Sequence, residues 1–143
     1  MTDGPKPTLV RELGATYHRG AASDACAGAD VVVECTGVAE LVFQVLNCTA
    51  PAGIVCLTGV STGGRLLRVD AGALNRELVL ENDVVFGSVN ASAAHYHGVV
   101  DALAGAEPGW LARLITRPMC LGEWQSALEQ KADDVKVVID LDR

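Results

Sequence analysis

The chain has 143 residues, of which half are hydrophobic and 4% aromatic, and its net charge is −7. This length fits one domain of ordinary size, with a core built mainly from Val, Leu and Ala. The acidic balance argues against a protein that binds nucleic acid, because contacts with phosphates need clustered Lys and Arg. It also makes an anionic membrane surface an unfavourable partner.

The sequence carries no signal for a membrane or for secretion. No apolar run reaches the length of a membrane-spanning helix, and the first residues, MTDGPKPTLVREL, lack the basic-then-apolar pattern of a signal peptide. The five cysteines follow no CxxC spacing and their number is odd, which favours reduced thiols over a disulfide framework. We therefore expect a cytoplasmic protein with reduced cysteines.

The first predicted elements are a helix and a buried strand. An amphipathic helix begins near Pro5 and ends near Gly14, and a brief strand, ATYH, follows over residues 15–18. The segment DVVVEC over residues 30–35 is short, β-branched and apolar, apart from its ends and one glutamate. Such a run is typical of a parallel strand that is buried on both faces.

Helices and strands then alternate along the chain. The elements predicted are a helix over residues 39–49, a strand over 54–58, a short strand over 66–69, a helix over 71–81, a strand over 83–89 and a helix over 92–104. In the last helix, Val99, Val100 and Leu103 are expected to face the interior. This alternation predicts an α/β fold with right-handed crossovers in a parallel, doubly wound sheet.

The pattern changes after Pro108. The segment GWLARLI, residues 109–115, has its apolar residues in helical register, and GEWQSALEQ, residues 122–130, indicates another short helix. VKVVIDL, residues 135–141, predicts a terminal strand. The last part of the chain is therefore expected to be a small helix and strand appendage.

Small and polar residues follow each of the three clear strands. The strands end in ECTG (34–37), LTGV (57–60) and GSVN (87–90). Ligands of open parallel sheets bind outside the carboxyl ends of the strands, so these three tips form a candidate site. Hydrogen bonds would come from Thr36, Thr58, Ser88 and Asn90. The alternative is that these side chains only cap the helices that follow.

Other chemical signals are weak or absent from the sequence. There is no GxGxxG turn after a strand and no Walker-type GKS or GKT. His95 and His97 form an H-x-H pair, but on the predicted helix they point about 200° apart, which disfavours a metal site. Glu34 lies in an apolar strand, where it is either a buried carboxylate with a shifted pKa or a residue at the strand's exposed end.

Four segments carry a family resemblance: LVRELGATY, DVVVECTG, AGALNRELVLENDVVFGSVN and VKVVIDL. They resemble the C-terminal part of zinc-dependent glucose 1-dehydrogenases, in the medium-chain dehydrogenase/reductase superfamily. Enzymes of that family oxidise an aldose at its anomeric carbon and pass the hydride to NADP or NAD. The resemblance implies a partial Rossmann-type sheet in residues 1–106, and a C-terminal segment, residues 107–143, that packs on a catalytic domain.

The resemblance also implies roles for the strand tips. The cofactor-binding residues would be Thr36, Gly37, Thr58, Gly59, Val60, Ser88, Val89 and Asn90. Of these, Asn90 would also touch the sugar substrate. The resemblance assigns this chain no catalytic residue and no zinc ligand.

The family's remaining parts would lie in sequence that precedes Met1. They are the glycine-rich turn, the residues that select NAD or NADP, and the zinc ligands. The chain would keep strand 3 and strands 4 to 6 of the six-strand order 3-2-1-4-5-6 but lack strands 1 and 2, so the strand over residues 30–35 would expose an edge and apolar faces. We expect the chain alone to be inactive, and to be poorly stable or rescued by a partner or by self-association.

Two other functions are considered for the chain. One is a non-catalytic α/β scaffold or dimerisation module derived from the same fold, which would self-associate without binding nucleotides. The other is a complete flavodoxin-like binding domain. That fold needs a phosphate loop after its first strand, and ECTGVAE has a single glycine, so it is disfavoured.

Overall fold

The computed structural model describes residues 4–64 and 66–142, which form two compact units. One unit is His18–Asn90, and the other combines Met1–Tyr17 with Ala91–Arg143. These boundaries differ from the predicted division between residues 1–106 and 107–143. That division concerns the whole protein and stays a prediction.

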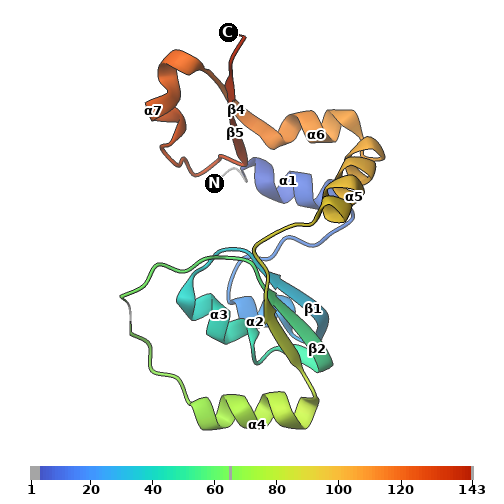
Figure 1. Ribbon diagram of the computed structural model, residues 1–143, viewed down its shortest axis with the longest axis vertical. Helices are drawn as coiled ribbons and strands as arrows, with labels where there is room; N and C mark the ends of the chain where they lie inside the picture. Colours follow the sequence, from blue (N-terminus) through green and yellow to red (C-terminus); the bar gives the residue numbers. More distant parts are fainter. Residues whose placement is uncertain (1–3, 65, 143) are drawn as a thin grey trace. The chain divides into compact units, whose positions relative to one another are not determined.

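The unit His18–Asn90 contains a three-stranded parallel sheet, as the alternation of elements predicts. Its strands are β1 (Ala29–Glu34), β2 (Thr49–Leu57) and β3 (Val84–Gly87), in the order β1-β2-β3 (Figure 1). The helices between them are α2 (Ala22–Cys26), α3 (Ala39–Val45) and α4 (Ala71–Glu81). Asp70 caps α4, because its carboxylate accepts a hydrogen bond from the main-chain nitrogen of Ala73 at 2.9 Å.

The core of this unit is small and lies between β2 and the helices α2 and α3. It consists of Cys26, Val45, Leu46 and the fully buried Val55. Burying a valine side chain completely stabilises a fold by roughly 2 kcal/mol. The expectation that the first strand is buried on both faces is wrong, because Val31 and Val33 are each 57% exposed. No element of the described part of this unit covers that face of β1.

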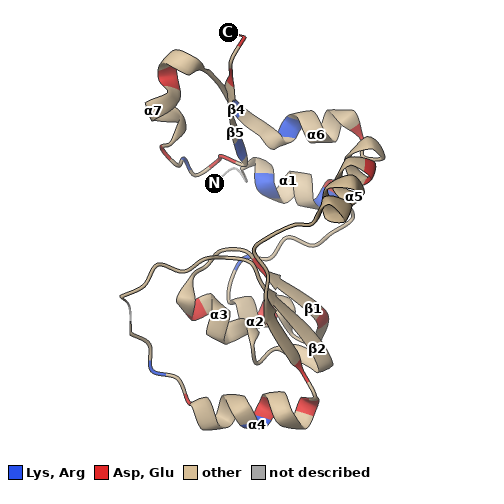
Figure 2. Cartoon of the chain, viewed as in Figure 1, with Lys and Arg blue, Asp and Glu red and all other residues tan. Residues whose placement is uncertain are grey.

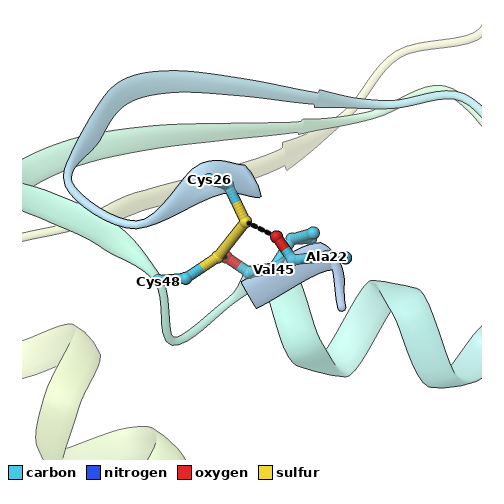
Figure 3. The surroundings of a disulfide bond; sticks show 4 residues. All are labelled: Ala22, Cys26, Val45 and Cys48. Atoms are coloured by element: carbon cyan, nitrogen blue, oxygen red, sulfur yellow. Dashed lines mark hydrogen bonds between the residues drawn. A yellow bond between two sulfur atoms is a disulfide. The ribbon is translucent and has the colours of Figure 1, made fainter. Parts of the chain in front are cut away.

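A disulfide joins Cys26, at the end of α2, to Cys48, which follows α3 (Figure 3). Their Cα atoms are 5.8 Å apart, although 22 positions separate them in the sequence. The expectation of reduced cysteines is therefore wrong for this pair, since the packing of α2 against α3 brings the two sulfurs together. When Cys26 is a thiol, its Sγ can donate to the carbonyl oxygen of Ala22, 2.8 Å away. Cys35, Cys56 and Cys120 are free thiols.

Two predicted strands are not present in the structure. Residues 15–18 and 66–69 are irregular, and neither segment pairs with another strand. Both are four-residue segments that mix apolar or aromatic residues with polar ones, and such segments become strands only where a partner supplies the hydrogen bonds.

The other unit contains five helical elements and two strands within the described residues. They are α1 (Pro5–Glu12), α5 (Ala93–Ala104), α6 (Pro108–Leu114), β4 (Ile115–Cys120), the 3-10 helix η1 (Leu121–Glu123), α7 (Trp124–Ala127) and β5 (Lys136–Asp140). The indole nitrogen of Trp110 donates to the carbonyl oxygen of Leu9 at 3.0 Å, and Arg113 pairs with Glu12 at 2.6 Å. These contacts hold α6 against α1.

The apolar face of α5 differs from the prediction. Val99, Val100 and Leu103 are each more than half exposed, although they were expected to face the interior. The spacing identifies the apolar face of the helix correctly, but it does not say whether another element covers that face. In the part of the chain that the structure describes, none buries it.

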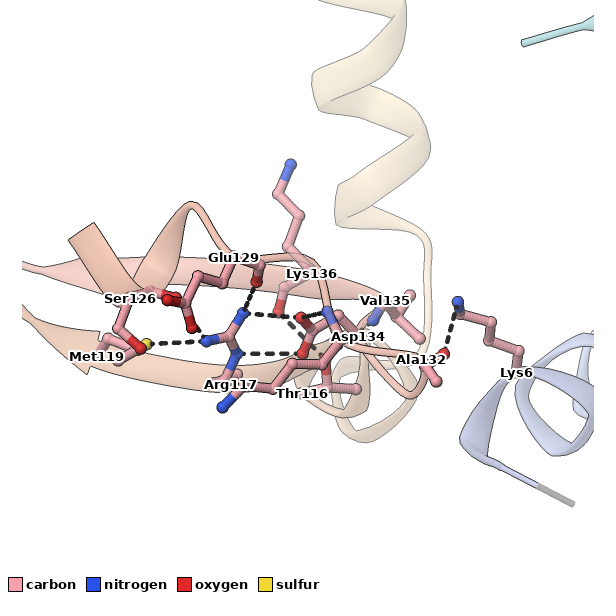
Figure 4. Close-up of polar contacts among 11 residues, drawn as sticks. Lys6, Thr116, Arg117, Met119, Ser126, Glu129, Ala132, Asp134, Val135 and Lys136 are labelled. Atoms are coloured by element: carbon pink, nitrogen blue, oxygen red, sulfur yellow. Dashed lines mark hydrogen bonds and ion pairs between the residues drawn. The ribbon is translucent and has the colours of Figure 1, made fainter. Parts of the chain in front are cut away.

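Strand β4 pairs in parallel with β5, and the sequence does not predict it. Arg117, on β4, forms hydrogen bonds with the segment that connects β4 to β5, residues 121–135 (Figure 4). Its guanidinium pairs with Asp134 at 2.7 Å and donates to the main-chain oxygens of Ser126 and Glu129 at 2.9 and 2.6 Å. The hydrogen bond from Arg117, followed by the one that the main-chain nitrogen of Lys131 donates at 2.9 Å, holds the pKa of Asp134 below its usual value.

Charged residues are scattered over several elements of both units rather than gathered in one (Figure 2). Within residues 4–64 and 66–142, no helix combines the length and the apolar character that crossing a membrane requires.

Candidate functional site at the strand tips

The three strands of the sheet end side by side. Leu57, the last residue of β2, pairs with Glu34 at the end of β1 and with Gly87 at the end of β3. The main-chain nitrogen of Ser88 still donates to the oxygen of Leu57, at 2.9 Å, just beyond the strand. The residues after Glu34, Leu57 and Gly87 therefore form one edge of the sheet, as the sequence predicts.

Glu34 is buried beneath the tip of β1. It is the only charged side chain that is buried in the described ranges, with 5% of its surface exposed. Its Oε1 accepts hydrogen bonds from the main-chain nitrogens of Thr36 and Gly37, at 2.6 and 3.1 Å, and from the hydroxyl of Thr36. The hydroxyl of Thr36, followed by the main-chain donors, holds the pKa of Glu34 below its usual value despite the opposing effect of burial.

The tips of β1 and β2 touch through their main chains. Gly37 has a φ of +67°, and a Cβ atom there would lie 2.5 Å from the carbonyl oxygen of Val60. A Cβ atom on Gly59 would lie 2.8 Å from the Cα of Gly37 and 2.7 Å from the Oε2 of Glu34. Only glycine at both positions lets the two tips approach this closely.

The two threonine hydroxyls are already engaged. The hydroxyl of Thr36 donates to Glu34 and accepts a hydrogen bond from the main-chain nitrogen of Val38 at 3.1 Å. The hydroxyl of Thr58 lies 3.0 Å from the main-chain oxygen of Glu34 and donates to it. Both hydroxyl hydrogens are therefore used within the tips, and both side chains help to shape them.

The polar tip residues do not cap the following helices. The N-cap residues of α3, α4 and α5 are Val38, Asp70 and Ser92. Ser88 and Asn90, at the tip of β3, are both exposed and precede the cap of α5. The alternative that these side chains serve only as helix caps is therefore wrong for all four residues.

Two valines at the tips are exposed to solvent. Val60, beyond β2, and Val89, beyond β3, are each 81% exposed. Exposed apolar side chains beside small polar residues suit a ligand that has both a flat apolar part and hydrogen-bonding groups.

The comparisons with known proteins identify the family. The sequence model described as Glucose dehydrogenase C-terminus matches residues 1–141. The chain belongs to this family. Glucose 1-dehydrogenase 2 of Vulcanisaeta moutnovskia is 36% identical over 142 residues, which cover 97% of this chain and 40% of that relative. Glucose 1-dehydrogenase 1 of Caldivirga maquilingensis is 37% identical with the same coverage.

A solved structure of a relative supports the same family. The glucose dehydrogenase of Haloferax mediterranei, in complex with NADP, Zn and gluconolactone, matches with a TM-score of 0.83 and 30% identity. The match covers 98% of this chain and 41% of that one. The chain thus spans about 40% of the length of the relatives named here. The predicted resemblance and the parallel α/β fold are confirmed.

A zinc ion of the kind named for the relative does not fit this chain's described residues. Among residues 4–64 and 66–142, no three His, Cys, Asp or Glu side chains gather closely enough to hold a metal ion. His95 is instead used in a capping box at the start of α5, where its Nδ1 accepts from the main-chain nitrogen of Ser92 at 3.2 Å. At the tips, Gly37 and Gly59 meet through their main chains, and the polar residues Ser88 and Asn90 are exposed.

A cleft that was not predicted from the sequence lies beside the first two tips. The cleft has a volume of about 210 Å³, and it is lined by Gly37, Val38, Ala39, Glu40, Ser61 and Thr62. The only sequence signal for it is that GVSTGG directly follows a strand tip.

Proposed function

We propose that this chain is the nicotinamide-nucleotide-binding part of a glucose (aldose) 1-dehydrogenase. The whole enzyme would transfer a hydride from C1 of the sugar to the nicotinamide ring of NADP or NAD. The observation that carries the proposal is the shared edge of three parallel strand tips, with glycines, exposed valines and an exposed asparagine, in a chain of this family.

Each tip would contact a different part of the cofactor or the sugar. Thr36 and Gly37 would line the cofactor cleft, and the segments Thr58–Val60 and Ser88–Asn90 would lie along the nicotinamide half. Val60 and Val89 would flank the apolar ring, and the amide of Asn90, which can donate and accept, would also contact a sugar hydroxyl. Holding the ring and the sugar together in this way brings the two reacting carbons into a productive geometry.

Other steps of the reaction would depend on residues outside this chain. A metal ion that lowers the pKa of the sugar hydroxyl, and the main anchors of the cofactor phosphates, would come from the part of the relatives that this chain does not match. We propose no catalytic residue within residues 1–143, and we expect the chain alone to be inactive. A cytoplasmic location is part of the same proposal.

Calorimetric titration of the purified chain with NADP, and separately with NAD, tests the proposal. We expect saturable binding, and at a free NADP concentration of 100 times Kd the free energy of unfolding should rise by about 2.7 kcal/mol. Saturable binding of neither nucleotide to a folded chain would refute the cofactor-binding role.

A pair of valine variants locates the binding surface. Val60→Asp puts a negative charge at a tip that would face an anionic cofactor, and it should raise the Kd of NADP by at least about tenfold. Val79→Asp is the matched control, because Val79 is also an exposed valine but lies on α4. Equal affinities of the two variants would contradict the assignment of the site to the tips.

A second function, a scaffold that associates with further copies of itself, is favoured by one observation. Val31 and Val33 on the outer strand β1 are exposed, and so are Val84 and Phe86 on the opposite outer strand β3. Association of these faces would bury apolar area and cover unpaired strand edges. Sedimentation would report a dimer or larger species for a scaffold, whereas a monomer that binds NADP would exclude it.

A further inference from the structure

Glu34 forms hydrogen bonds with the tips of both β1 and β2, and it uses different atoms for each. Its carboxylate binds the turn Thr36–Gly37, and its main-chain oxygen accepts from the nitrogens of Thr58 and Gly59 at 2.8 and 3.0 Å. The hydroxyl of Thr58 adds a third hydrogen bond to the same oxygen. One residue therefore ties together two segments that follow different strands.

The carboxylate is the part of Glu34 that determines the shape of the first tip. Its Oε2 accepts from the nitrogen of Gly37 at 3.2 Å, while Oε1 takes the donors of Thr36. A carboxylate that accepts several main-chain N–H groups fixes their directions, because each bond is charge-assisted and directional. The turn then holds Gly37 at its positive φ, against the carbonyl group of Val60.

An aliphatic side chain in place of Glu34 would remove the acceptor of the hydrogen bonds that hold the turn Thr36–Gly37. The main-chain donors of Thr36 and Gly37 would turn to water, since Thr36 is exposed. The turn would then sample other shapes, and only a fraction of molecules would present the first tip in its present form. The apparent Kd of a ligand rises as the inverse of that fraction.

We propose that Glu34 is a positioning residue for the nicotinamide nucleotide, which acts by holding the turn Thr36–Gly37 against the second tip. This inference rests on the proposed function, because it needs a cofactor at the tips. Glu34 itself lies beneath the turn and makes no contact with the ligand.

Three variants of the full chain test the inference. Glu34→Ala removes every side-chain acceptor, whereas Glu34→Gln keeps one oxygen of the same size and removes the charge. Glu77→Gln is the matched control, because Glu77 is exposed on α4 in the same unit. The Kd of NADP is measured by calorimetry, at a temperature at which circular dichroism reports that each chain is folded.

Amide hydrogen exchange separates positioning from a general loss of stability. In Glu34→Ala, exchange at Thr36 and Gly37 should accelerate, because their acceptor is gone. Exchange at Thr58 and Gly59 should stay slow, since they donate to the main-chain oxygen of residue 34, which the substitution leaves in place. A purely structural role of Glu34 would accelerate exchange at all four amides together.

We expect Kd to rise by about tenfold or more in Glu34→Ala, to rise less in Glu34→Gln, and to stay unchanged in Glu77→Gln. A Kd for folded Glu34→Ala within about twofold of the unaltered chain would overturn the inference and leave the proposed function standing. If Glu34→Ala does not fold, Glu34→Gln decides in the same way, by a raised or an unchanged Kd. Failure of the unaltered chain to bind NADP would overturn both proposals, and it is seen before any variant is made.

Discussion

Replacing Gly59 with alanine should separate the first two strand tips. The added Cβ would lie nearest to the main-chain nitrogen of Gly37, and also 2.8 Å from the Cα of Gly37 and 2.7 Å from the Oε2 of Glu34, whereas ordinary contacts begin at 3.4 Å. The tips must therefore part by more than half an ångström. The Cα of Gly37 belongs to the main chain, and Glu34 is held by its own hydrogen bonds, so neither neighbour can simply rotate away.

The cost of this separation lies at the upper end of the range for overpacked sites, at about 3 kcal/mol. Urea unfolding of the chain, followed by circular dichroism, measures it as a lower midpoint with an unchanged slope. Gly63→Ala is the matched control, because a Cβ at Gly63 meets no atom within 4 Å and its φ is not positive. The control should change the free energy of unfolding by less than about 0.5 kcal/mol.

The two alanine variants must differ if the close approach of the tips is real. Equal stabilities of Gly59→Ala and Gly63→Ala would refute the main-chain contact between Gly37 and Gly59. The same result would remove the physical basis for a shared edge between the first two tips. A loss of NADP affinity in Gly59→Ala alone, in folded protein, would connect that contact to the binding site.

Three other predictions concern the rest of the chain. Arg117→Ala should lower the free energy of unfolding by about 3 kcal/mol, as measured by urea unfolding. Two main-chain carbonyl oxygens would each lose a hydrogen bond from a charged donor, and each such bond contributes about 1.5 kcal/mol. Arg117→Lys, which keeps the charge but not the planar fork, should recover only part of that loss. Reducing the bond between Cys26 and Cys48 should cost about 3 kcal/mol from the opened loop, and thiol counts that do not change on adding a reductant would contradict the bond. The pKa of Asp134 is lower in the folded chain than in the unfolded one, so its stabilisation is full above about pH 4 and is lost as the pH falls through the folded value. The unfolding midpoint of Asp134→Asn should therefore depend less on pH below 4 than that of the unaltered chain, and parallel profiles would contradict this.

The sheet could be predicted from the sequence because its strands are short, β-branched runs separated by helical patterns. Strands β1, β2 and β3 were identified in this way, and the parallel arrangement follows from the helices between them. Strand β4 was missed for a physical reason. Ile115 continues the helical register of α6, and Pro118 lacks a donor for a sheet, so only the pairing with β5 makes this segment a strand.

The position of the candidate site was also predictable, but its internal contacts were not. The carboxyl ends of parallel strands share an edge, so ECTG, LTGV and GSVN had to lie together. The contact between Gly37 and Gly59, and the burial of Glu34 under its own turn, depend on how the segments after β1 and β2 pack against each other. The spacing of residues along the sequence does not predict how these two segments pack. The roles of the tip residues toward the cofactor stay predictions.

The extent of burial was the property that the sequence predicted least well. The apolar runs at residues 31–33 and 99–103 were expected to be interior, yet Val31, Val33, Val99 and Val100 are exposed. Apolar periodicity identifies the face of an element that favours a partner. Whether a partner is present depends on the other elements of the protein.

The bond between Cys26 and Cys48 closes a covalent ring that contains β1, α3 and the tip of β1. A protease that cuts any one peptide bond inside this ring leaves the two pieces attached to each other. Such a nicked chain runs as one species without a reductant and as two species with it. The ring therefore keeps Glu34 and its turn tethered to the rest of the sheet even after the main chain has been cut.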